Sequence, residues 1–541
     1  MKCKGRIIWC LLVSLCSIHA MNAQKHSFLN KPSNKLQMAE YAIANLYVDS
    51  VDEAQLVDSA IIKMLEQLDP HSTYSDPQEV RELTEPLQGK FDGIGIQFSM
   101  VEDTLLVIQP IAGGPSEKIG ILAGDRIVTV NDTTIAGTKL RTEKIMRKLR
   151  GPKGTKVNVK VLRRGVDGLL DFTIKRDKIP VYSIDASYLI NKRTGYVKIS
   201  RFAATTHKEF REVLQHLQRE GMKDLILDLQ GNGGGYLEAA IDMTNEFLGK
   251  KELIVYTEGR KNPRSEFRAK GTGLLQKGRL IILIDEYTAS ASEIVTGAVQ
   301  DWDRGIIVGR RSFGKGLVQR PIDLPDGSMI RLTVARYYTP SGRCIQKTYG
   351  KNLADYNEEL LKRYNSGEMI NADSIHFPDS LKYQTLKLRR TVYGGGGIMP
   401  DYFVPVDTTM YTAYHRRIAL KGVLLRYHFQ LIDAYRNEWV EKYKKLEDFN
   451  RRFEITDDMI RQLIDLAKKE GITCKNEDEY RKSLPLMKLQ LKALIARDLW
   501  NTSEYYQIIN EANLSVKKAL NLLKEKEFDQ LFIKNDRPVG R

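Results

Sequence analysis

Residues 280–295 read LIILIDEYTASASEIV, a run of five apolar residues followed by polar and small ones. The apolar run has the length of a buried strand, and the residues after it predict a turn and then a helix that begins near Ser290. Unpaired N–H groups and the helix dipole at such an N-terminus favour developing negative charge. Ser290 is therefore a candidate nucleophile, at a place where an alkoxide or a tetrahedral oxyanion would be stabilised.

The same residues have a second interpretation. Ser290 and Glu293 match a capping box, in which a serine is followed three residues later by a glutamate. Taken alone, this motif favours a helix cap over a catalytic serine. Other segments of the chain must decide between the two.

Residues 306–319, IIVGRRSFGKGLVQ, hold a lysine between two glycines after another apolar run. Gly309 to Lys315 matches the beginning of a phosphate-binding loop, G-x-x-x-x-G-K. That loop requires Ser or Thr next and then a helix, whereas Gly316 stands there and the following LVQRP resembles a strand. The segment disfavours an NTPase and leaves Lys315 for another role.

A lysine base would account for a serine nucleophile that has no evident histidine. The sequence contains no G-x-S-x-G elbow, no H-E-x-x-H helix and no Cys/His pairing at zinc spacing. His71 follows a proline turn and His207 begins an exposed helix. A lysine with its ordinary pKa of about 10.4 is protonated at neutral pH, so Lys315 would have to be desolvated. Its near neighbours carry no opposite charge, and Gln319 offers an amide to orient the amine.

Residues 227–235, LDLQGNGGG, place glycines directly after a predicted buried strand. Glycines free backbone N–H groups to point at a substrate carbonyl, and each such donor of an oxyanion hole is worth about 2.7–4 kcal/mol. A flexible turn before a helix explains the same residues equally well.

Residues 90–178 consist of short β-rich runs. The predicted strands are 94–98, 104–108, 126–130, 157–162 and 170–174, with helices at 116–119 and 142–149. Together with the run PSEKIGILAGD at 115–125, this stretch resembles the PDZ domains of bacterial proteases. By that resemblance, Gly93, Ile94, Gly95 and Ile96 would bind the terminal carboxylate of a peptide through backbone N–H groups. A simple glycine turn is the alternative.

The remaining segments outline the other parts of the chain. Helical spacing of apolar residues covers 34–68, and the sequence beyond 405 is helical, basic and aromatic. Between 194 and 405 strands and helices alternate, with strands at 195–199, 224–229 and 280–284 and a helix at 207–220. Such alternation predicts an α/β core.

Five segments together resemble one family. They are DLxGNxGG, TASASEI, GxxxFGKGxVQ, TPSGRCIQ at 339–346 and YGGGGIMPD at 393–401. Each is weak alone, but in combination they resemble the C-terminal processing peptidases, or tail-specific proteases, over about residues 35–405. The resemblance implies a Ser–Lys serine endopeptidase with a crotonase-like α/β core and an inserted PDZ domain, which cleaves near substrate C-termini through an acyl-enzyme.

The resemblance also implies roles for individual residues. Its serine-to-lysine spacing of 25 positions selects Ser290 over Ser292 as nucleophile, with Lys315 as general base and Gln319 orienting it. The N–H groups of Ala291 and Gly234 would form the oxyanion hole, and Asp301 matches a supporting acidic position. No metal or organic cofactor is implied. One departure is Gly233, which stands in the oxyanion loop where the family commonly has proline.

The expected division is a signal peptide at 1–23, a helical segment at 24–88, a PDZ-like domain at 89–178, a protease core at 179–405 and a helical C-terminal extension at 406–541. Lys2, Lys4 and Arg6 precede an apolar run at 7–18, and the small residue Ala23 follows, which is typical of a secretory signal. We therefore expect an exported, periplasmic protein; an uncleaved membrane anchor is the alternative. Without the signal two cysteines remain, Cys344 and Cys474.

The formal net charge of +16 would suit an anionic partner, but lysine and arginine are spread along the whole chain without a nucleic-acid-binding motif. The expected partners are proteins or peptides with exposed C-terminal tails, and a second copy or an adaptor at the C-terminal extension. Two other interpretations remain, a catalytically silent peptide-binding scaffold and an acyl-CoA enzyme on the same fold.

Overall fold

The computed structural model describes residues 32–111, 113–350, 355–356, 358–524 and 528. The chain forms two compact units. The described part of the first comprises residues 32–78 and 319–333, and the second holds the rest. The predicted signal peptide lies outside the described residues.

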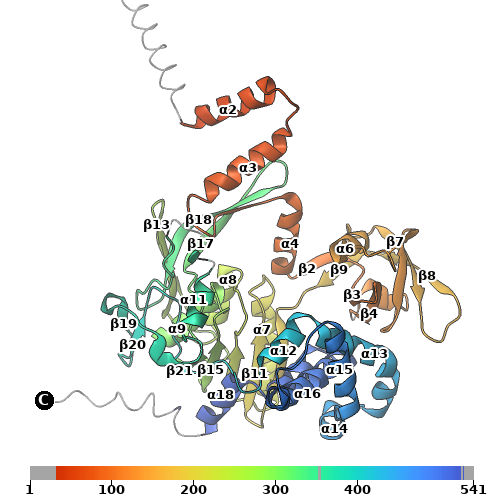
Figure 1. Cartoon of the computed structure of the whole chain (residues 1–541). Coiled ribbons are helices and arrows are strands. Elements are labelled where there is room, and N and C mark those ends of the chain that lie inside the picture. Colours follow the sequence, from red (N-terminus) through yellow and green to blue (C-terminus); the bar gives the residue numbers. More distant parts are fainter. Residues whose placement is uncertain (1–31, 112, 351–354, 357, 525–527, 529–541) are drawn as a thin grey trace, which may run out of the picture. The chain divides into compact units, whose positions relative to one another are not determined.

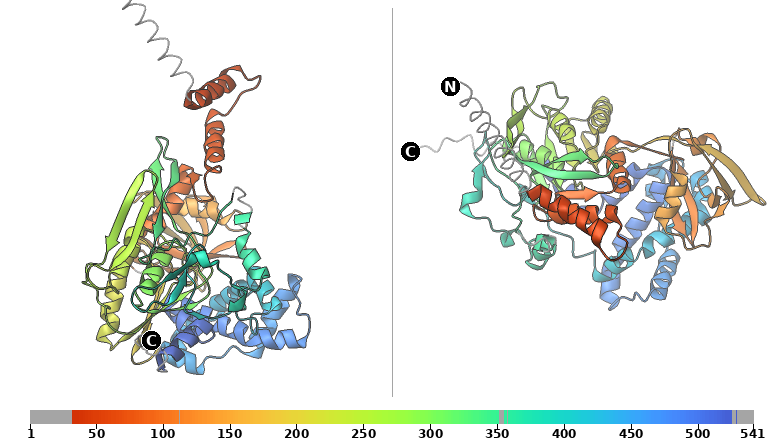
Figure 2. Two further views of the ribbon diagram at one scale, coloured as in Figure 1. Left: turned by 90° about the vertical axis from the view of Figure 1, so that its left-hand side faces the viewer. Right: turned by 90° about the horizontal axis from the view of Figure 1, so that it is seen from above.

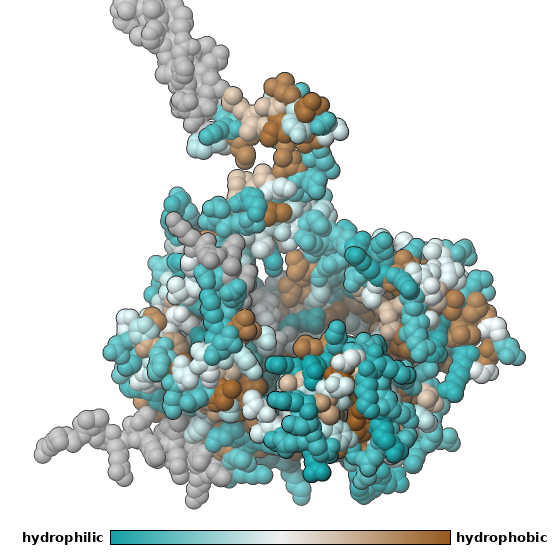
Figure 3. All heavy atoms as spheres, viewed as in Figure 1, coloured by the Kyte–Doolittle hydropathy of each residue, from teal (hydrophilic) through white to brown (hydrophobic). Residues whose placement is uncertain are grey.

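The first unit contains two helices of the predicted helical N-terminal segment, and most of a third, α4 (Pro77–Gln88), belongs to the second unit. The two helices of the first unit are α2 (Pro32–Leu46) and α3 (Glu53–Leu65), and the side chain of Asp52 caps α3 by accepting the N–H of Gln55. The short β1 (Thr73–Ser75) follows and pairs with the first residues of β18 (Met329–Tyr338). No residue of α2 is buried, and apolar side chains gather on the surface of these helices (Figure 3).

The second unit is built on a six-stranded sheet with five parallel strands. Its order is β10 (Ile184–Leu189), β11 (Thr194–Ile199), β12 (Asp224–Asp228), β15 (Leu280–Ile284), β16 (Ile306–Gly309) and β21 (Tyr402–Phe403). Only β10 runs antiparallel to its neighbour. The central strands are apolar on both faces because helices cover both, which confirms the predicted α/β alternation.

Helices cover this sheet on two sides (Figures 1 and 2). One face packs against α7 (Thr206–Arg219), α8 (Leu237–Thr244) and α9 (Ala291–Asp301). The other face packs against α18 (Leu514–Lys524), and α17 (Thr502–Ile509) lies beside β10. Two helices from the end of the chain therefore complete the core, which the pattern after residue 405 did not predict.

The loops that follow the parallel strands β12, β15 and β16 leave the sheet at its carboxyl edge. In sheets of this kind, ligands bind at that edge. These three loops contain residues 229–236, 285–290 and 310–316, which are the glycine run, the Ser290 turn and the Lys315 segment.

The chain also contains antiparallel strands outside this sheet. Among them are β13 (Leu253–Gly259), β14 (Asn262–Arg268), β17 (Leu317–Asp323), β18, β19 (Lys382–Gln384) and β20 (Thr391–Tyr393). Within the second unit, β13 pairs with the last residues of β18. The strand β17 after Lys315 confirms that this segment lacks the helix of a phosphate loop.

Residues 90–180 form the predicted PDZ-like domain. Its strands are β2 (Lys90–Gly93), β3 (Ile96–Val101), β4 (Thr104–Pro110), β5 (Arg126–Val130), β6 (Thr133–Thr134), β7 (Lys156–Leu162), β8 (Leu169–Lys175) and β9 (Asp177–Pro180), with helices α5 (Pro115–Lys118) and α6 (Thr142–Leu149). Most predicted elements are confirmed. The first strand is an exception, because it begins at Ile96; Gly95 has φ +73° and forms part of the turn before it.

The C-terminal region is helical, as predicted, and has an apolar core of its own. The helices of this core are α12 (Ala413–Leu420), α13 (Val423–Lys442), α14 (Leu446–Arg452), α15 (Asp457–Lys469) and α16 (Glu477–Leu499), and α17 adds Ile508 to it. Among the described residues, no helix is long and apolar enough to cross a membrane.

Candidate active site

Ser290 stands at the junction of the turn after β15 and the first residue of α9. Its backbone has φ +57° and ψ −115°, a conformation that residues with a Cβ rarely adopt. Backbone strain of this kind is concentrated at functional sites, where the surrounding structure enforces it. The turn before it is fixed by Thr288, whose hydroxyl accepts the N–H of Asp285 and donates to the Leu229 carbonyl. Ser290 is partly exposed, although nearly all of α9 is buried.

Lys315 lies in the loop between β16 and β17, flanked by two glycines that the structure requires. A Cβ on Gly314 would lie 3.0 Å from the N atom of Gly397, and one on Gly316 would lie 2.9 Å from the N atom of Gln346. Gly316 also donates its N–H to Gln346 Oε1 at 2.8 Å. These glycines therefore allow backbones to pack closely, which explains their presence without a phosphate.

The carboxylate of Glu293 joins the two candidate catalytic segments. Its Oε2 accepts the N–H of Ser290 at 2.8 Å and that of Lys315 at 2.9 Å, while Oε1 accepts the N–H of Gly314 and the hydroxyl of Ser312. Burial raises the pKa of this carboxyl to about 7, although all four hydrogen bonds lower it. Glu293 thus makes the capping contact with Ser290 that the sequence predicts. Its hydrogen bonds to Ser312, Gly314 and Lys315 were not predicted.

Tyr337 joins the same two segments from their carbonyl groups. Its hydroxyl shares its single proton between the Ser290 carbonyl, at 3.1 Å, and the Lys315 carbonyl. The side chain is buried, and burial, followed by the nearby Glu293, raises its pKa well above the ordinary value. The hydroxyl therefore remains a donor at any physiological pH, and the backbones of Ser290 and Lys315 are held together on both sides.

The glycine run after β12 lies directly against the serine. A Cβ on Gly234, which has φ +101°, would be 2.8 Å from Ser290 Cβ and 3.0 Å from Ala291 N. Only glycine permits this approach. The N–H of Gly234 donates to Asn232 Oδ1 at 2.9 Å, so in this structure its hydrogen bond lies within the loop. Ala291 begins α9, where N–H groups have no acceptor within the helix.

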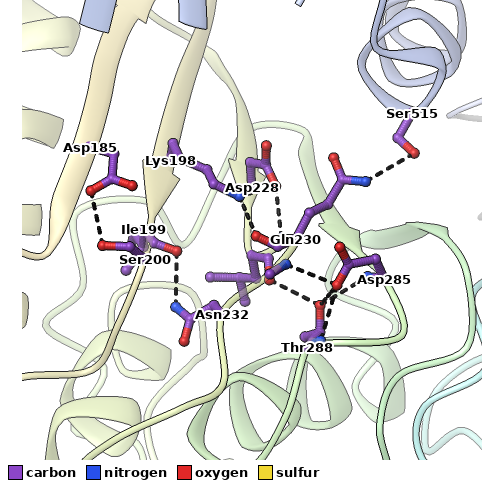
Figure 4. Close-up of polar contacts among 12 residues, drawn as sticks. Asp185, Lys198, Ile199, Ser200, Asp228, Gln230, Asn232, Asp285, Thr288 and Ser515 are labelled. Atoms are coloured by element: carbon purple, nitrogen blue, oxygen red, sulfur yellow. Dashed lines mark hydrogen bonds and ion pairs between the residues drawn. The ribbon is translucent and has the colours of Figure 1, made fainter. Parts of the chain in front are cut away.

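A buried polar network supports the start of this loop (Figure 4). Asp228 Oδ1 accepts from Lys198 Nζ at 3.2 Å and from the N–H of Gln230 at 2.8 Å, and its Oδ2 accepts the Tyr196 hydroxyl. The Lys198 amine also donates to the Gln230 carbonyl. Asp285 accepts the N–H of Gly231 at 2.9 Å. The polypeptide between β12 and Gly234 is therefore held by side chains from three neighbouring strand ends.

Asp301, the last residue of α9, is completely buried and lies away from the serine end. Its Oδ1 is 2.6 Å from the guanidinium of Arg343, which is also completely buried, and its Oδ2 accepts the N–H of Ser341. Both partners belong to the TPSGRCIQ segment, whose Gln346 supports Gly316 beside Lys315. Asp301 therefore anchors the segment that contacts the lysine loop.

Gln319 belongs to the first unit and lies on β17, four positions after Lys315 in the chain. Its side-chain amide donates to the carbonyl of His71. In the sequence, His71 is recognisable only as a residue after a proline turn.

In the PDZ domain, the predicted carboxylate loop is built as a tight connection. The Ile94 carbonyl accepts the N–H and the hydroxyl of Ser116, and the Gly95 carbonyl accepts the N–H of Ile111. The next strand, β3, is the terminal strand of its sheet. An edge strand beside such a loop is the arrangement to which PDZ domains add a peptide strand.

The residues that the sequence analysis missed are those that connect segments far apart in the chain, namely Tyr337, Asn232 and Gln346. Asn232 appeared only as the N of DLxGNxGG, and Gln346 only as the end of a motif. Among the described residues no group of three or more His, Cys, Asp or Glu side chains is arranged to hold a metal ion, and Cys344 and Cys474 are free thiols.

Comparison with known families assigns most of the chain. The model of peptidase family S41 matches residues 193–352, and a PDZ-domain model matches 93–175. The N-terminal domain of the activating protease CtpB matches 14–79, and a family of unknown function matches 414–501.

Individual relatives agree with these assignments. The carboxy-terminal-processing protease of Bartonella bacilliformis is 38% identical over 334 residues, which are 60% of this chain and 76% of the relative. The carboxy-terminal processing protease CtpA of Bacillus subtilis is 35% identical over 345 residues, 62% of this chain and 73% of the relative. Among solved structures, the photosystem II D1 C-terminal processing protease has a TM-score of 0.35 and 28% identity, and the match covers 59% of this chain and 85% of that one.

Proposed function

The chain belongs to the carboxy-terminal processing proteases of peptidase family S41, serine-type peptidases with a PDZ domain, and from this premise we propose its mechanism. Ser290 is the nucleophile and Lys315 the general base of an endopeptidase that cleaves unstructured C-terminal tails. The observation that carries the proposal is the double connection through Glu293 and Tyr337, which fixes the backbones of Ser290 and Lys315 beside each other.

The reaction proceeds in two halves. Ser290 Oγ attacks the carbonyl carbon of the scissile bond while its proton passes to the unprotonated amine of Lys315. The lysine then gives this proton to the leaving amine, and an acyl-enzyme on Ser290 remains. In the second half Lys315 takes a proton from water, the hydroxide attacks the ester, and Ser290 regains its proton as the product acid leaves.

The oxyanion of each tetrahedral intermediate accepts the N–H of Ala291 at the start of α9. Gly234 supplies the second N–H once that group turns from Asn232 Oδ1 to the substrate oxygen. Catalytic hydrogen bonds are often completed only when substrate is bound. Gln319 orients the lysine, and Asp301 supports the site from the far end of α9. We assign the core to the crotonase-like α/β folds on the basis of its layered parallel sheet.

The PDZ domain is proposed to recognise the free C-terminus of the substrate. A PDZ domain fits the binding of peptide C-termini. The loop from Gly93 to Ile96 would bind the terminal carboxylate, and β3 would pair with the tail. We further propose export to the periplasm, based on the secretory pattern of residues 1–23. Sequencing the N-terminus of the protein recovered from a periplasmic fraction tests this, because export with cleavage predicts a start just after Ala23.

The dyad is tested with purified Ser290→Ala and Lys315→Ala proteins and a substrate that ends in an unstructured apolar tail. Both variants should lose cleavage completely and keep the circular dichroism spectrum of the wild type. Ser265→Ala and Lys277→Ala, which change exposed residues of the same types, are the matched controls and should cleave normally. Wild-type turnover by either dyad variant would show that the assignment is wrong.

The PDZ role is tested on the uncut complex. Full-length Ser290→Ala protein is titrated with a tail peptide that has a free C-terminus and with the same peptide amidated. The free acid should bind at least tenfold more tightly, since amidation removes the charge that the loop would bind. Equal affinities would place tail recognition elsewhere.

A further inference from the structure

Gln230 connects the glycine run to the end of the chain. It stands in the variable position of DLxGNxGG, between Asp228 of β12 and the glycines that lead to Gly234. Its main chain is fixed from the core side. The N–H donates to Asp228 Oδ1 at 2.8 Å, and the carbonyl accepts the amine of Lys198 (Figure 4).

The side chain of Gln230 points to the first residues of α18. Its Nε2 donates to Ser515 Oγ at 3.4 Å (Figure 4), and its Oε1 accepts from Asn513 Nδ2 at 3.1 Å. Asn513 also caps α18, because its Oδ1 accepts the N–H groups of Ser515 and Val516. One glutamine is thus bonded both to the core network and to the last helix.

The glycine run transmits the position of Gln230 to the serine over a short path. The N–H of Gly231 donates to Asp285, the Asn232 carbonyl accepts the N–H of Ala289, and Gly234 lies against Ser290 Cβ. Interiors packed as closely as this transmit displacements instead of absorbing them. A shift of Gln230 would therefore move the oxyanion donors relative to the nucleophile.

We propose that α18 positions the oxyanion loop of the protease through Gln230, with Asn513 and Ser515 as the contact residues. All three are positioning residues, since none touches the reacting atoms. The inference rests on the proposed oxyanion role of the loop around Gly234. It gives the C-terminal segment a part in catalysis beyond covering the sheet.

The polar contact is separable from the packing of α18. Apolar side chains fasten the helix to the sheet, and Val516, Ala519 and Leu522 are almost completely buried there. Gln230, Asn513 and Ser515 instead line an open pocket of about 240 Å³, together with residues 404–407 and Tyr411. Substitutions in this pocket leave the apolar contact of the helix intact, so a loss of activity can be distinguished from a loss of fold.

The first test replaces Gln230 in the full-length protein. Gln230→Met has nearly the same shape but loses both side-chain hydrogen bonds, and we expect kcat to fall about tenfold with KM within twofold of the wild type. Gln230→Glu keeps an acceptor for Asn513 Nδ2 and for the Ser515 hydroxyl, so it should restore most of kcat. A Gln230→Met protein with wild-type kcat overturns the proposal, and so does an equal fall in both variants.

The second test changes the residue of α18 that contacts Gln230 and compares it with a similar helix cap elsewhere. Asn513→Ala and Asn501→Ala each remove the asparagine cap of a C-terminal helix, and Asn501 accepts the N–H of Ser503 at the start of α17. Both should lower Tm similarly, but only Asn513→Ala should lower kcat. In a Gln230→Met background, Asn513→Ala should cause no further fall. Equal kcat for the two cap variants would overturn the proposal even if Gln230→Met did not fold.

These outcomes are distinguishable from failure of the catalytic assignment. If Ser290→Ala retains activity, the dyad is wrong. If Ser290→Ala is inactive while the Gln230 and Asn513 variants keep wild-type kcat, the dyad stands and the positioning role of α18 is rejected.

Discussion

Glu293 lies in the first turn of α9 and Asp301 is its last residue, and both carboxylates are completely buried. Glu293 accepts four hydrogen bonds, three of them from backbone N–H groups and none from a cation. Asp301 forms an ion pair with a completely buried arginine. The helix dipole favours an anion at the first position and disfavours one at the second, so only Asp301 requires a positive partner.

From this difference we expect Glu293 to position the proposed catalytic residues and Asp301 to support the fold. Two of the four partners of Glu293 are the backbone N–H groups of Ser290 and Lys315, so a change in its charge reaches both proposed catalytic residues. The partner of Asp301 is Arg343, 42 positions along the chain, and the pair fastens one segment to the helix. We therefore expect substitution of Asp301 to lower mainly the unfolding free energy, and substitution of Glu293 to lower mainly the rate of cleavage.

The largest expected effect is on the stability of Asp301→Ala. Without the carboxylate, the guanidinium of Arg343 stays buried and uncompensated, which costs about 3–5 kcal/mol. Urea unfolding followed by fluorescence measures the change. The double variant Asp301→Ala/Arg343→Met is the control and should recover much of the loss, because no unpaired charge remains. A single variant less than about 1 kcal/mol below the wild type would contradict the ion-pair interpretation.

The second prediction concerns turnover in Glu293→Gln. Glutamine keeps the shape of the side chain, but its NH2 group faces N–H or O–H donors that now bond to a carboxylate oxygen. Because two donors cannot bond to each other, we expect the segments of Ser290 and Lys315 to separate slightly. A misplacement of about 1 Å can lower the rate about 100-fold, and we expect kcat/KM to fall by that order. Glu238→Gln, on the exposed side of α8, is the matched control. If both variants cleave equally well, the connection through Glu293 is not needed for catalysis.

The third prediction follows from the titration of Glu293. Its pKa is raised to about 7 in the folded chain from an ordinary value of 4.5, so the folded state binds the proton more tightly than the unfolded state. The stability that this provides is fully present below pH 4.5 and is lost as pH rises through 7. Between pH 5 and pH 8 the loss amounts to about 2 kcal/mol.

The measurement is the difference in unfolding free energy between the wild type and Glu293→Gln at these two pH values. Glutamine does not titrate, so the wild type should lose its relative stability as pH rises, by about 2 kcal/mol. A difference that stays constant between pH 5 and pH 8 would mean that Glu293 does not titrate in this range. The pKa of the carboxyl would then be set mainly by its hydrogen bonds, which lower it, rather than by burial, which raises it.

The two ends of α9 also mark what the sequence can predict. The strand β15, the turn and the start of α9 follow from local patterns, and the capping contact is predicted from Ser290 and Glu293, which stand three positions apart. The other partners of Glu293 lie 19 to 22 positions away, beyond any local pattern. For this reason the sequence alone could not decide between a cap and a catalytic serine, and the family resemblance was needed.

The same limit applies to the C-terminal region. An apolar stripe shows that a helix covers something, but it does not identify the surface that is covered. The helical content after residue 405 was predicted, whereas the packing of α18 on β15 and β16 required the structure. Similarly, the sequence shows the two glycines beside Lys315, but Gly397 and Gln346 could be named as their neighbours only from the fold.

The smallest expected effect is that of Tyr337→Phe, which tests the carbonyl side of the connection made by Glu293. The hydroxyl shares one proton between two carbonyls, each of which keeps its other backbone surroundings, so its loss should lower stability by about 1 kcal/mol and kcat by a few-fold. Tyr338→Phe, the next residue of β18, is the control and removes a hydroxyl from a tyrosine that stacks on Tyr256. If Tyr337→Phe lowers kcat as much as Glu293→Gln does, the serine and lysine segments are held as firmly through their carbonyls as through their N–H groups. The carboxylate at the start of α9 would then share its positioning role equally with a hydroxyl on β18.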